Sequence, residues 1–279
     1  MSTKNFVPQL WAATILRTLE DNLVAKKICT TQYTGEIKSK GDTVHFNGLA
    51  EPTISPYTGS TISYEALQDS RISLVVDQSD MFAFKVGDIE KVQSGMDIKG
   101  SQAQRAGYQL TKSCDTYIMG LYGQAGNTIT SATVTSANVL SVLGSFEQQL
   151  AENNVADNQM WMVIPPWLRL KLELAGVKFQ INNGLNKTGG MAWCDQLGFT
   201  VYVTNQVKNT GTIATPVSHI IAGSGNAIGF ADQITETEDI RLESTFDTAV
   251  RGLHVYGAKV IKPLELATGA LTFGAESTI

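Results

Sequence analysis

Residue types that support metal or nucleophilic chemistry are few and scattered in this chain of 279 residues. The histidines and cysteines are His45, His219, His254, Cys29, Cys114 and Cys194. None of them lies in an HxH, HExxH or Cys-His spacing that would suit a metal. His45 sits in an alternating strand pattern, opposite Val44 and Phe46, and we interpret it as a surface or interface residue. The three cysteines form no CxxC pair, which argues against a disulfide framework and suits a reducing compartment.

Two other patterns resemble functional motifs without matching them. The run GSGNAIG at 223–229 has GxGxxxG spacing, whereas a dinucleotide-binding loop has GxGxxG, so we expect a strand-to-helix turn there. Neither a GxxxxGK[ST] loop nor a GxSxG elbow occurs. Carboxylates gather at Glu236, Glu238, Asp239 and Glu243, without EF-hand spacing, and a solvated or interface-facing run is the favoured interpretation. We predict no catalytic residue, metal or cofactor.

The composition indicates a globular protein with an unusually uncharged surface. Hydrophobic residues make up 43% and charged residues 17%, against a norm of about 25% charged. The net charge of −5 gives no sign of the positive surface that binds DNA or an anionic membrane. We find no signal-peptide core and no apolar run long enough to span a bilayer. A surface rich in small polar residues is suited to being covered by neighbours.

The sequence of the first part of the chain predicts two segments that have too few apolar residues to form a hydrophobic core of their own. Apolar spacing predicts an amphipathic helix over 8–28, which would need a partner surface. From 31 to 84, scattered Gly and Pro separate short alternating runs, such as 43–46 and 71–77, which predict antiparallel strands. Residues 49–64 hold few large aliphatics, so we expect a long protruding loop or hairpin there.

A long helix and a mixed domain follow. Residues 88–122 carry a discontinuous apolar stripe, with Asp88 as a plausible N-cap. The glycines Gly95, Gly100 and Gly107 suggest a kink, a break near Gly100 or close packing. The remainder predicts helices at 138–153 and 167–175, strands at 159–164, 199–203 and 218–222, and a closing strand at 250–260. Gly176 suits the end of the second helix, and 182–190 reads as an exposed loop. The fold class is therefore α+β.

Some large aromatic residues have an obvious place and others do not. Trp161 lies in an apolar strand and is expected in the core. Phe6 and Trp11 lie on the leading helix, where contact with another subunit is favoured over packing within the chain. Charged residues of the extended segment are candidates for pairing with a second subunit, although exposed ion pairs contribute only about 0–1 kcal/mol each.

The order of these parts resembles the tailed-bacteriophage major capsid proteins with the HK97-type fold, in the branch grouped with P22-like coat proteins. The similar runs are FVPQLW at 6–11, GDTV at 41–44, the helix from Asp88, WMVIPP at 161–166, GFTVYVTN at 198–205, GFA at 229–231 and VYGAKVI at 255–261. The resemblance implies an N-terminal arm helix at 1–30, an extended β-hairpin E-loop at 31–86, a spine helix and the start of the peripheral domain at 87–135, and peripheral and axial domains at 136–279.

The resemblance also implies a non-enzymatic structural protein. Its subunits would form pentamers and hexamers of an icosahedral virion capsid around double-stranded DNA, assembled in the cytoplasm of a bacterial host. A scaffolding protein, a portal and a decoration protein are the implied partners, and no membrane is involved. The implied intersubunit residues are Phe6, Trp11, Leu16, Lys38, Lys40, Asp42, Glu51, Tyr57 and Glu65. No crosslink is predicted from Lys38 or Lys40. An encapsulin-like non-viral compartment shell and an α/β nucleotide-binding enzyme remain alternatives.

Overall fold

A computed structural model describes most of the chain outside its N-terminal region and several loops. The described residues are 24–31, 41, 43–49, 54, 69–87, 98–155, 160–177, 191–194, 198–212, 215–241 and 247–275. The predictions for residues 1–23, for nearly all of 50–68, for Asp88 and Gly95 and for the loop at 182–190 lie outside them. Within the described residues, no helix is both long and apolar enough to cross a membrane.

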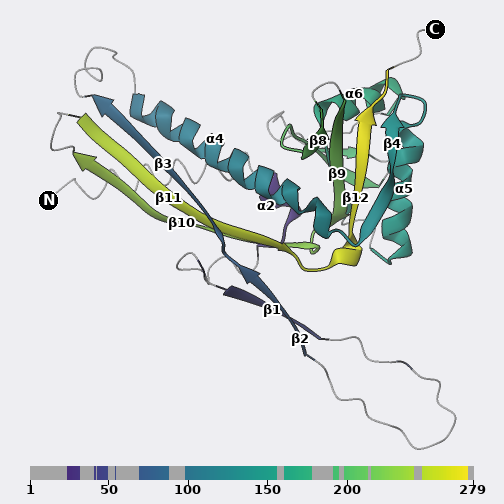
Figure 1. Ribbon diagram of the computed structural model, residues 1–279, viewed down its shortest axis with the longest axis horizontal. Coiled ribbons are helices and arrows are strands. Elements are labelled where there is room, and N and C mark those ends of the chain that lie inside the picture. Colours follow the sequence, from purple (N-terminus) through teal and green to yellow (C-terminus); the bar gives the residue numbers. More distant parts are fainter. Residues whose placement is uncertain are drawn as a thin grey trace, which may run out of the picture.

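The described residues form two lobes that meet at one corner (Figure 1). One lobe is a mixed seven-stranded sheet whose spatial order is β4 (Asn127–Val134), β12 (Leu266–Phe273), β9 (Pro216–Ser224), β5 (Met160–Ile164), β7 (Phe199–Val203) and β6 (Met191–Cys194), with β8 (Asn209–Gly211) paired to β9. All five residues of β5 are buried, as expected for a central strand covered on both faces. Trp161 belongs to this strand, and its predicted core position is confirmed.

Two helices pack on the seven-stranded sheet, and both were predicted. Helix α5 (Val139–Glu152) buries one stripe at helical spacing, and Gly269 of β12 lets the ring of Phe146 approach the sheet closely. Helix α6 (Pro166–Leu174) begins at a proline, whose fixed φ suits the first helical position. Gly176 follows the helix with φ +86°, as its predicted role requires.

The second lobe is elongated and consists of a three-stranded antiparallel sheet with one long helix. The strands are β10 (Ile228–Arg241), β11 (Asp247–Val260) and β3 (Gln78–Gly87), in that spatial order. Helix α4 (Ile98–Met119), about 33 Å long, lies along this sheet and ends in the 3-10 turn η3 (Gly120–Gln124) (Figure 1). The helix is continuous from Ile98 through Gly100, so a break at Gly100 itself is wrong, while residues 88–97 lie outside the described part of the chain. Gly107 is buried, which fits the alternative of close packing.

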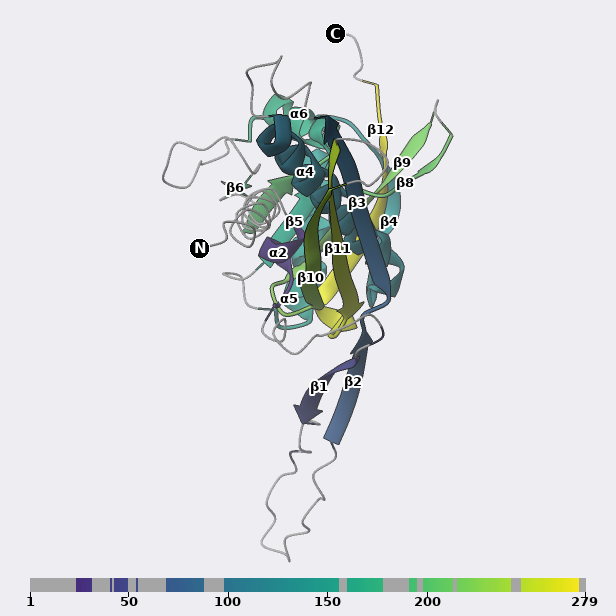
Figure 2. The ribbon, with the colours of Figure 1, turned by 90° about the vertical axis from the view of Figure 1, so that its left-hand side faces the viewer.

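A two-stranded ribbon projects from the elongated lobe (Figure 2). It consists of β1 (Thr43–Leu49) and β2 (Asp69–Val75), paired antiparallel from Thr43↔Val75 to Leu49↔Asp69. The two strands confirm the alternating runs predicted at 43–46 and 71–77. The base of the ribbon has a small core, in which Val44, Leu74 and Val76 pack with residues of the three-stranded sheet.

Three chain crossings between the lobes meet in one hydrogen-bonded corner, which we call the crossover joint: residues 120–127, 224–228 and 261–266, including the turn η5 (Pro263–Glu265). The Gly126 amide donates to Pro263 O at 2.8 Å, and the Asn127 side chain donates to Leu264 O at 2.7 Å. The Ile261 amide donates to Ala227 O at 2.8 Å. The lobes are thus tied together by backbone bonds between all three crossings.

An acid-sensitive contact closes the crossover joint. Glu265 accepts hydrogen bonds from Ser224 and from Lys262, whose Nζ lies 2.6 Å from Glu265 Oε1. Burial alone would raise the pKa of Glu265, but these hydrogen bonds outweigh it and hold the pKa below its ordinary value of 4.5. Because the pKa is lowered in the folded state, the contact stabilises above the unfolded-state pKa and is lost as the pH falls through the folded value.

The Glu265→Gln variant tests this contact. We expect its urea midpoint to lie below that of the unmodified chain at pH 7, and the difference to shrink as the pH falls below 4.5. Urea unfolding at a series of pH values measures both quantities. A difference that stays constant down to acid pH would show that the carboxylate charge contributes nothing here.

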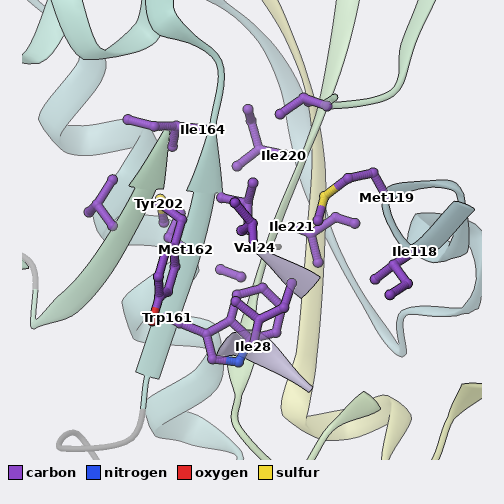
Figure 3. Packing of buried hydrophobic residues seen from close by; sticks show 14 of the residues in the cluster. Val24, Ile28, Ile118, Met119, Trp161, Met162, Ile164, Tyr202, Ile220 and Ile221 are labelled. Atoms are coloured by element: carbon purple, nitrogen blue, oxygen red, sulfur yellow. The ribbon is translucent and has the colours of Figure 1, made fainter. Parts of the chain in front are cut away.

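The end of the leading helix lies inside the protein. Helix α2 (Ala25–Ile28) lies at the end of the helix predicted over 8–28 and ends at the predicted residue, but Val24 is a bend, so the prediction of helix is wrong at that residue. Val24 and Ile28 belong to the main hydrophobic cluster, among side chains of β5, β9 and α4 (Figure 3). The expectation that this helix needs a partner surface is therefore met within the chain for its last turn.

Some strand predictions are wrong or incomplete. The turn at 223–229 joins two strands, β9 and β10, so the predicted strand-to-helix turn is wrong, and with it the strand–turn–helix context that nucleotide binding requires. The last strand is β12, so residues 250–260, which form part of β11, do not close the fold. Strands β4, β6, β8, β10 and β12 were not predicted.

Candidate subunit interface

The nine residues implied as intersubunit contacts belong to the N-terminal region and to the segment around β1. Phe6, Trp11, Leu16, Lys38, Lys40, Asp42, Glu51, Tyr57 and Glu65 all lie outside the described residues. Four of them, at positions 42–65, belong to the segment that contains β1 and precedes β2. Their role stays a prediction, while the described residues indicate surfaces of their own.

The outer face of the three-stranded sheet is covered at one end and bare at the other. Near the ribbon base, Val255 is buried beneath Leu74 and Val76. Two residues earlier along β11, Leu253 is only partly buried, and its cross-strand partner Met81 is 83% exposed. These two residues line an open groove of about 340 Å³. We call Met81, Ala83 and Leu253 the bare face.

Charged pairs border the bare face. The Arg251 guanidinium donates to Glu238 at 2.7 Å, and Lys85 lies 3.8 Å from Asp247. Glu238 belongs to the carboxylate run that we interpreted as solvated or interface-facing, and it is paired across the strands instead of gathered at a metal. An apolar centre with a charged rim is the arrangement typical of protein interfaces.

The free edge of β3 adjoins the bare face. Among the described strands, β3 pairs on one side only, with β11. Its residues 79–84 line a groove of about 720 Å³ against α4. An unpaired strand edge beside an exposed apolar side chain favours contact with another chain.

The base of the ribbon packs closely against the three-stranded sheet because a glycine, Gly257, occupies the contact position on β11. A Cβ on Gly257 of β11 would lie 2.7 Å from Val75 O and 2.9 Å from Val76 Cα. We expect Gly257→Ala to lower the free energy of unfolding by about 1–3 kcal/mol, because the ribbon base must move aside. Urea unfolding measures the loss. The control is Gly225→Ala, where a Cβ meets nothing within 4 Å; equal effects of the two changes would contradict this account.

A buried polar cluster brings together a cysteine, a histidine and an aspartate in the order of a catalytic triad. Cys114 Sγ of α4 lies 3.7 Å from His254 Nδ1 of β11, and His254 Nε2 lies 3.7 Å from Asp232 Oδ2 of β10. No sequence pattern indicates this cluster, because the three residues are far apart in the chain. His254 also stacks on Tyr256, whose hydroxyl donates to Asp80 at 2.9 Å.

The cluster lacks the properties of a nucleophilic site. Cys114 and His254 are buried between α4 and the sheet. Burial, and next the charge of Asp232, raises the pKa of the Cys114 thiol far above its ordinary value, so the thiol stays protonated. The distance of 3.7 Å from His254 Nε2 to Asp232 Oδ2 is too long for a normal hydrogen bond, and the contact between Cys114 Sγ and His254 Nδ1 is a weak sulfur hydrogen bond. We interpret the cluster as part of the packing between helix and sheet.

The remaining candidates for chemistry have structural roles among the described residues. His45 is exposed and lies 3.1 Å from Ser73 Oγ, which confirms its interpretation as a surface residue. His219 contacts Thr210 Oγ1 at 2.8 Å and stacks on Tyr122, and burial lowers its pKa. No group of three or more His, Cys, Asp or Glu in the described part of the chain could hold a metal ion.

Comparisons with known proteins identify the architecture. No protein-family model and no curated protein matches this sequence. A solved structure from Mycobacterium phage Che8 matches with a TM-score of 0.67 at 21% identity, over 88% of this chain and 90% of that one. The capsid structure of the cyanophage P-SCSP1u matches with a TM-score of 0.64 at 14% identity, over 85% of each chain. The chain has the HK97-type capsid fold.

The HK97-type fold predicted from the order of the parts is thus confirmed, as is the α+β class. The same architecture occurs in a virus-like particle from Pyrococcus furiosus, which matches with a TM-score of 0.57 at 14% identity over 92% of this chain and 96% of that one. The finer assignment to the P22-like branch stays a prediction. Sequence reasoning missed the bare face, although alternation in 79–85 places Met81 and Ala83 on one side.

Proposed function

We propose that this chain is the major capsid subunit of a tailed bacteriophage, a structural protein that assembles with itself into an icosahedral shell. The observation that supports the proposal is the likeness in fold to the Che8 structure over nearly the full length of both chains. The proposal includes no catalytic activity. In it, residues 1–30 act as an arm, 31–86 as an E-loop, 87–135 as the spine and 136–279 as the peripheral and axial domains.

The ribbon and the bare face provide the means of assembly in this proposal. A projecting two-stranded ribbon has too little core to be stable alone and gains stability by packing on a neighbour. The bare face offers an apolar surface of the kind such a contact needs. Repeated around closed rings, modest contacts become strong through effective concentration. Pentamers and hexamers built this way would hold the nine implied residues at or near subunit contacts.

The contents and partners of the shell follow from the charge and the resemblance. A net charge of −5 suits a container that encloses double-stranded DNA without gripping it. We further propose a separate scaffolding protein, a portal and a decoration protein as partners. Assembly would take place in the cytoplasm of a bacterial host, and the mature protein would reside in the virion.

A non-viral compartment shell is the second candidate, because the Pyrococcus furiosus virus-like particle shares the fold. The two functions differ in what the particle contains. Particles purified from infected or expressing cells would be analysed by electron microscopy, nuclease digestion and mass spectrometry. Nuclease-protected double-stranded DNA supports the phage capsid, whereas a stoichiometric cargo protein without DNA supports the compartment shell.

A further inference from the structure

The segment that links the N-terminal arm to the body lies between the two lobes. We call residues 24–30 the wedge: Val24, helix α2, Cys29 and Thr30. Ile28 is 1% exposed, and Val24 and Cys29 are also buried. In Figure 3, Val24 and Ile28 lie among Trp161 and Met162 of β5, Ile220 and Ile221 of β9, and Ile118 and Met119 at the end of α4. One short segment therefore contacts elements of both lobes.

Backbone bonds fix the other end of the wedge to the elongated lobe. The Thr30 amide donates to Ile228 O at 2.9 Å, and the Phe230 amide donates to Thr30 O at 3.0 Å. These bonds form a parallel bridge to Gly229, at the start of β10. The bridge lies next to the crossover joint, where residues 224–228 lead from β9 into β10. The wedge is thus a fourth segment that is hydrogen-bonded at the corner where the three chain crossings meet.

The helix of the wedge depends on contacts with the rest of the protein to stay in place. A helix of four residues is far too short to be stable without tertiary contacts. Among the described residues no other helix or strand is continuous with it, since Thr31, which follows it, belongs to neither. Its apolar side chains belong to the hydrophobic cluster that the two lobes share, so withdrawing them would loosen the contact between the lobes.

We propose that residues 24–30 set the angle between the two lobes, acting as an adjustable wedge at the crossover joint. If the chain is a shell subunit, which is the proposed function, one sequence must fit both fivefold and sixfold rings. An adjustable joint supplies the required difference in subunit shape. The arm that precedes the wedge is then the means by which a neighbouring subunit shifts it. The first statement concerns the free subunit and holds whether or not a shell forms.

Two variants of equal chemistry test the wedge in the unassembled protein. Ile28→Ala removes a buried aliphatic side chain from the wedge, and Leu143→Ala removes one of equal burial from α5, inside one lobe. Amide hydrogen exchange would be followed by mass spectrometry. For Ile28→Ala we expect at least tenfold faster exchange in both the last turn of α4 and the start of β10, with α5 unchanged. For Leu143→Ala we expect the change within the seven-stranded lobe alone.

Cys29 provides a second readout on the same samples. It is buried, and its modification by N-ethylmaleimide, located by peptide mass spectrometry, reports withdrawal of the wedge. Cys114, buried between α4 and the sheet, is the internal control. We expect Ile28→Ala to speed modification of Cys29 at least tenfold and of Cys114 by less than twofold. Equal acceleration at both cysteines, or exchange changes confined to one lobe, would overturn the proposal.

Two truncations test the angle directly. A chain lacking residues 1–20 keeps the wedge, and a chain lacking 1–30 loses it. We expect small-angle scattering to give the first the same distance between lobes as the full chain, and the second a wider distribution. Identical scattering from the two truncated chains, with unchanged exchange in Ile28→Ala, would refute the wedge. Absence of shells from an otherwise confirmed wedge would count against the proposed function instead.

Discussion

The Met81→Asp variant is expected to fold normally and to fail to assemble. Met81 is 83% exposed in the single chain, so the change costs the folded subunit about 0.5 kcal/mol or less. At a contact between subunits, a carboxylate in place of the thioether must be buried without a partner, which costs several kcal/mol. Because every subunit repeats the defect, we expect the assembled fraction to fall by about tenfold or more.

The matched control is Met81→Leu, which keeps the bare face apolar. We expect it to assemble like the unmodified chain under the same conditions, as measured by sedimentation velocity and negative-stain microscopy. Urea unfolding of the unassembled variants checks that both are folded. If Met81→Asp assembles as readily as Met81→Leu, the bare face is not a subunit contact.

Replacing the segment that joins the two strands of the ribbon is expected to give a stable subunit that forms no shell. The last paired residues of the ribbon are Leu49 and Asp69, so residues 50–68 can be replaced by Asn-Gly, which favours the tight turn that closes a two-residue hairpin. The core at the ribbon base is untouched, since Val44, Leu74 and Val76 all remain. We expect no loss of unfolding free energy beyond about 1 kcal/mol.

The effect on assembly should be much larger than the effect on stability. The replaced segment carries Glu51, Tyr57 and Glu65, three of the residues implied in intersubunit contacts. In a control, residues 50–68 are replaced by a Gly-Ser linker of equal length. This variant keeps the length of the segment and loses its side chains, so it distinguishes the effect of length from the effect of the side chains. Normal shells from the tight-turn variant would show that the ribbon is not needed for assembly.

Local patterns were enough to predict many elements correctly. The alternation in 71–77, the apolar stripe of α5, the buried run of β5 and the glycine after α6 each depend on interactions within a few residues. The ribbon was predicted in the same way, from alternating runs and from the scarcity of aliphatics between them. The HK97-type fold then followed from the order of the parts, without any single diagnostic motif.

Features that depend on distant pairing were missed. Strand β4 is rich in Thr and Ser and has few large apolar residues, and it is a strand because β12 pairs with it in parallel, some 140 residues later in the chain. The turn after β9 has the composition of a nucleotide loop, but a strand follows it because β10 pairs with β11 along nearly its whole length. Neither partner is visible from local sequence.

The candidate interface was harder to predict than the fold. An amphipathic helix has the same sequence pattern whether its apolar side packs on its own chain or on another chain. The burial of Val24 and Ile28 between the lobes was therefore not predicted. The exposure of Met81 likewise follows from where the ribbon base ends on the sheet. Both depend on the register of elements far apart in sequence.

The most direct test of the central claim is electron microscopy combined with sedimentation velocity on the purified full chain over a wide range of concentration and salt. We expect rings of five or six subunits, or closed icosahedral particles, in equilibrium with the 30.1 kDa chain, and we expect both to be lost in Met81→Asp. A chain that stays a 30.1 kDa monomer under every condition, alone and when co-expressed with its neighbouring genes, would contradict it.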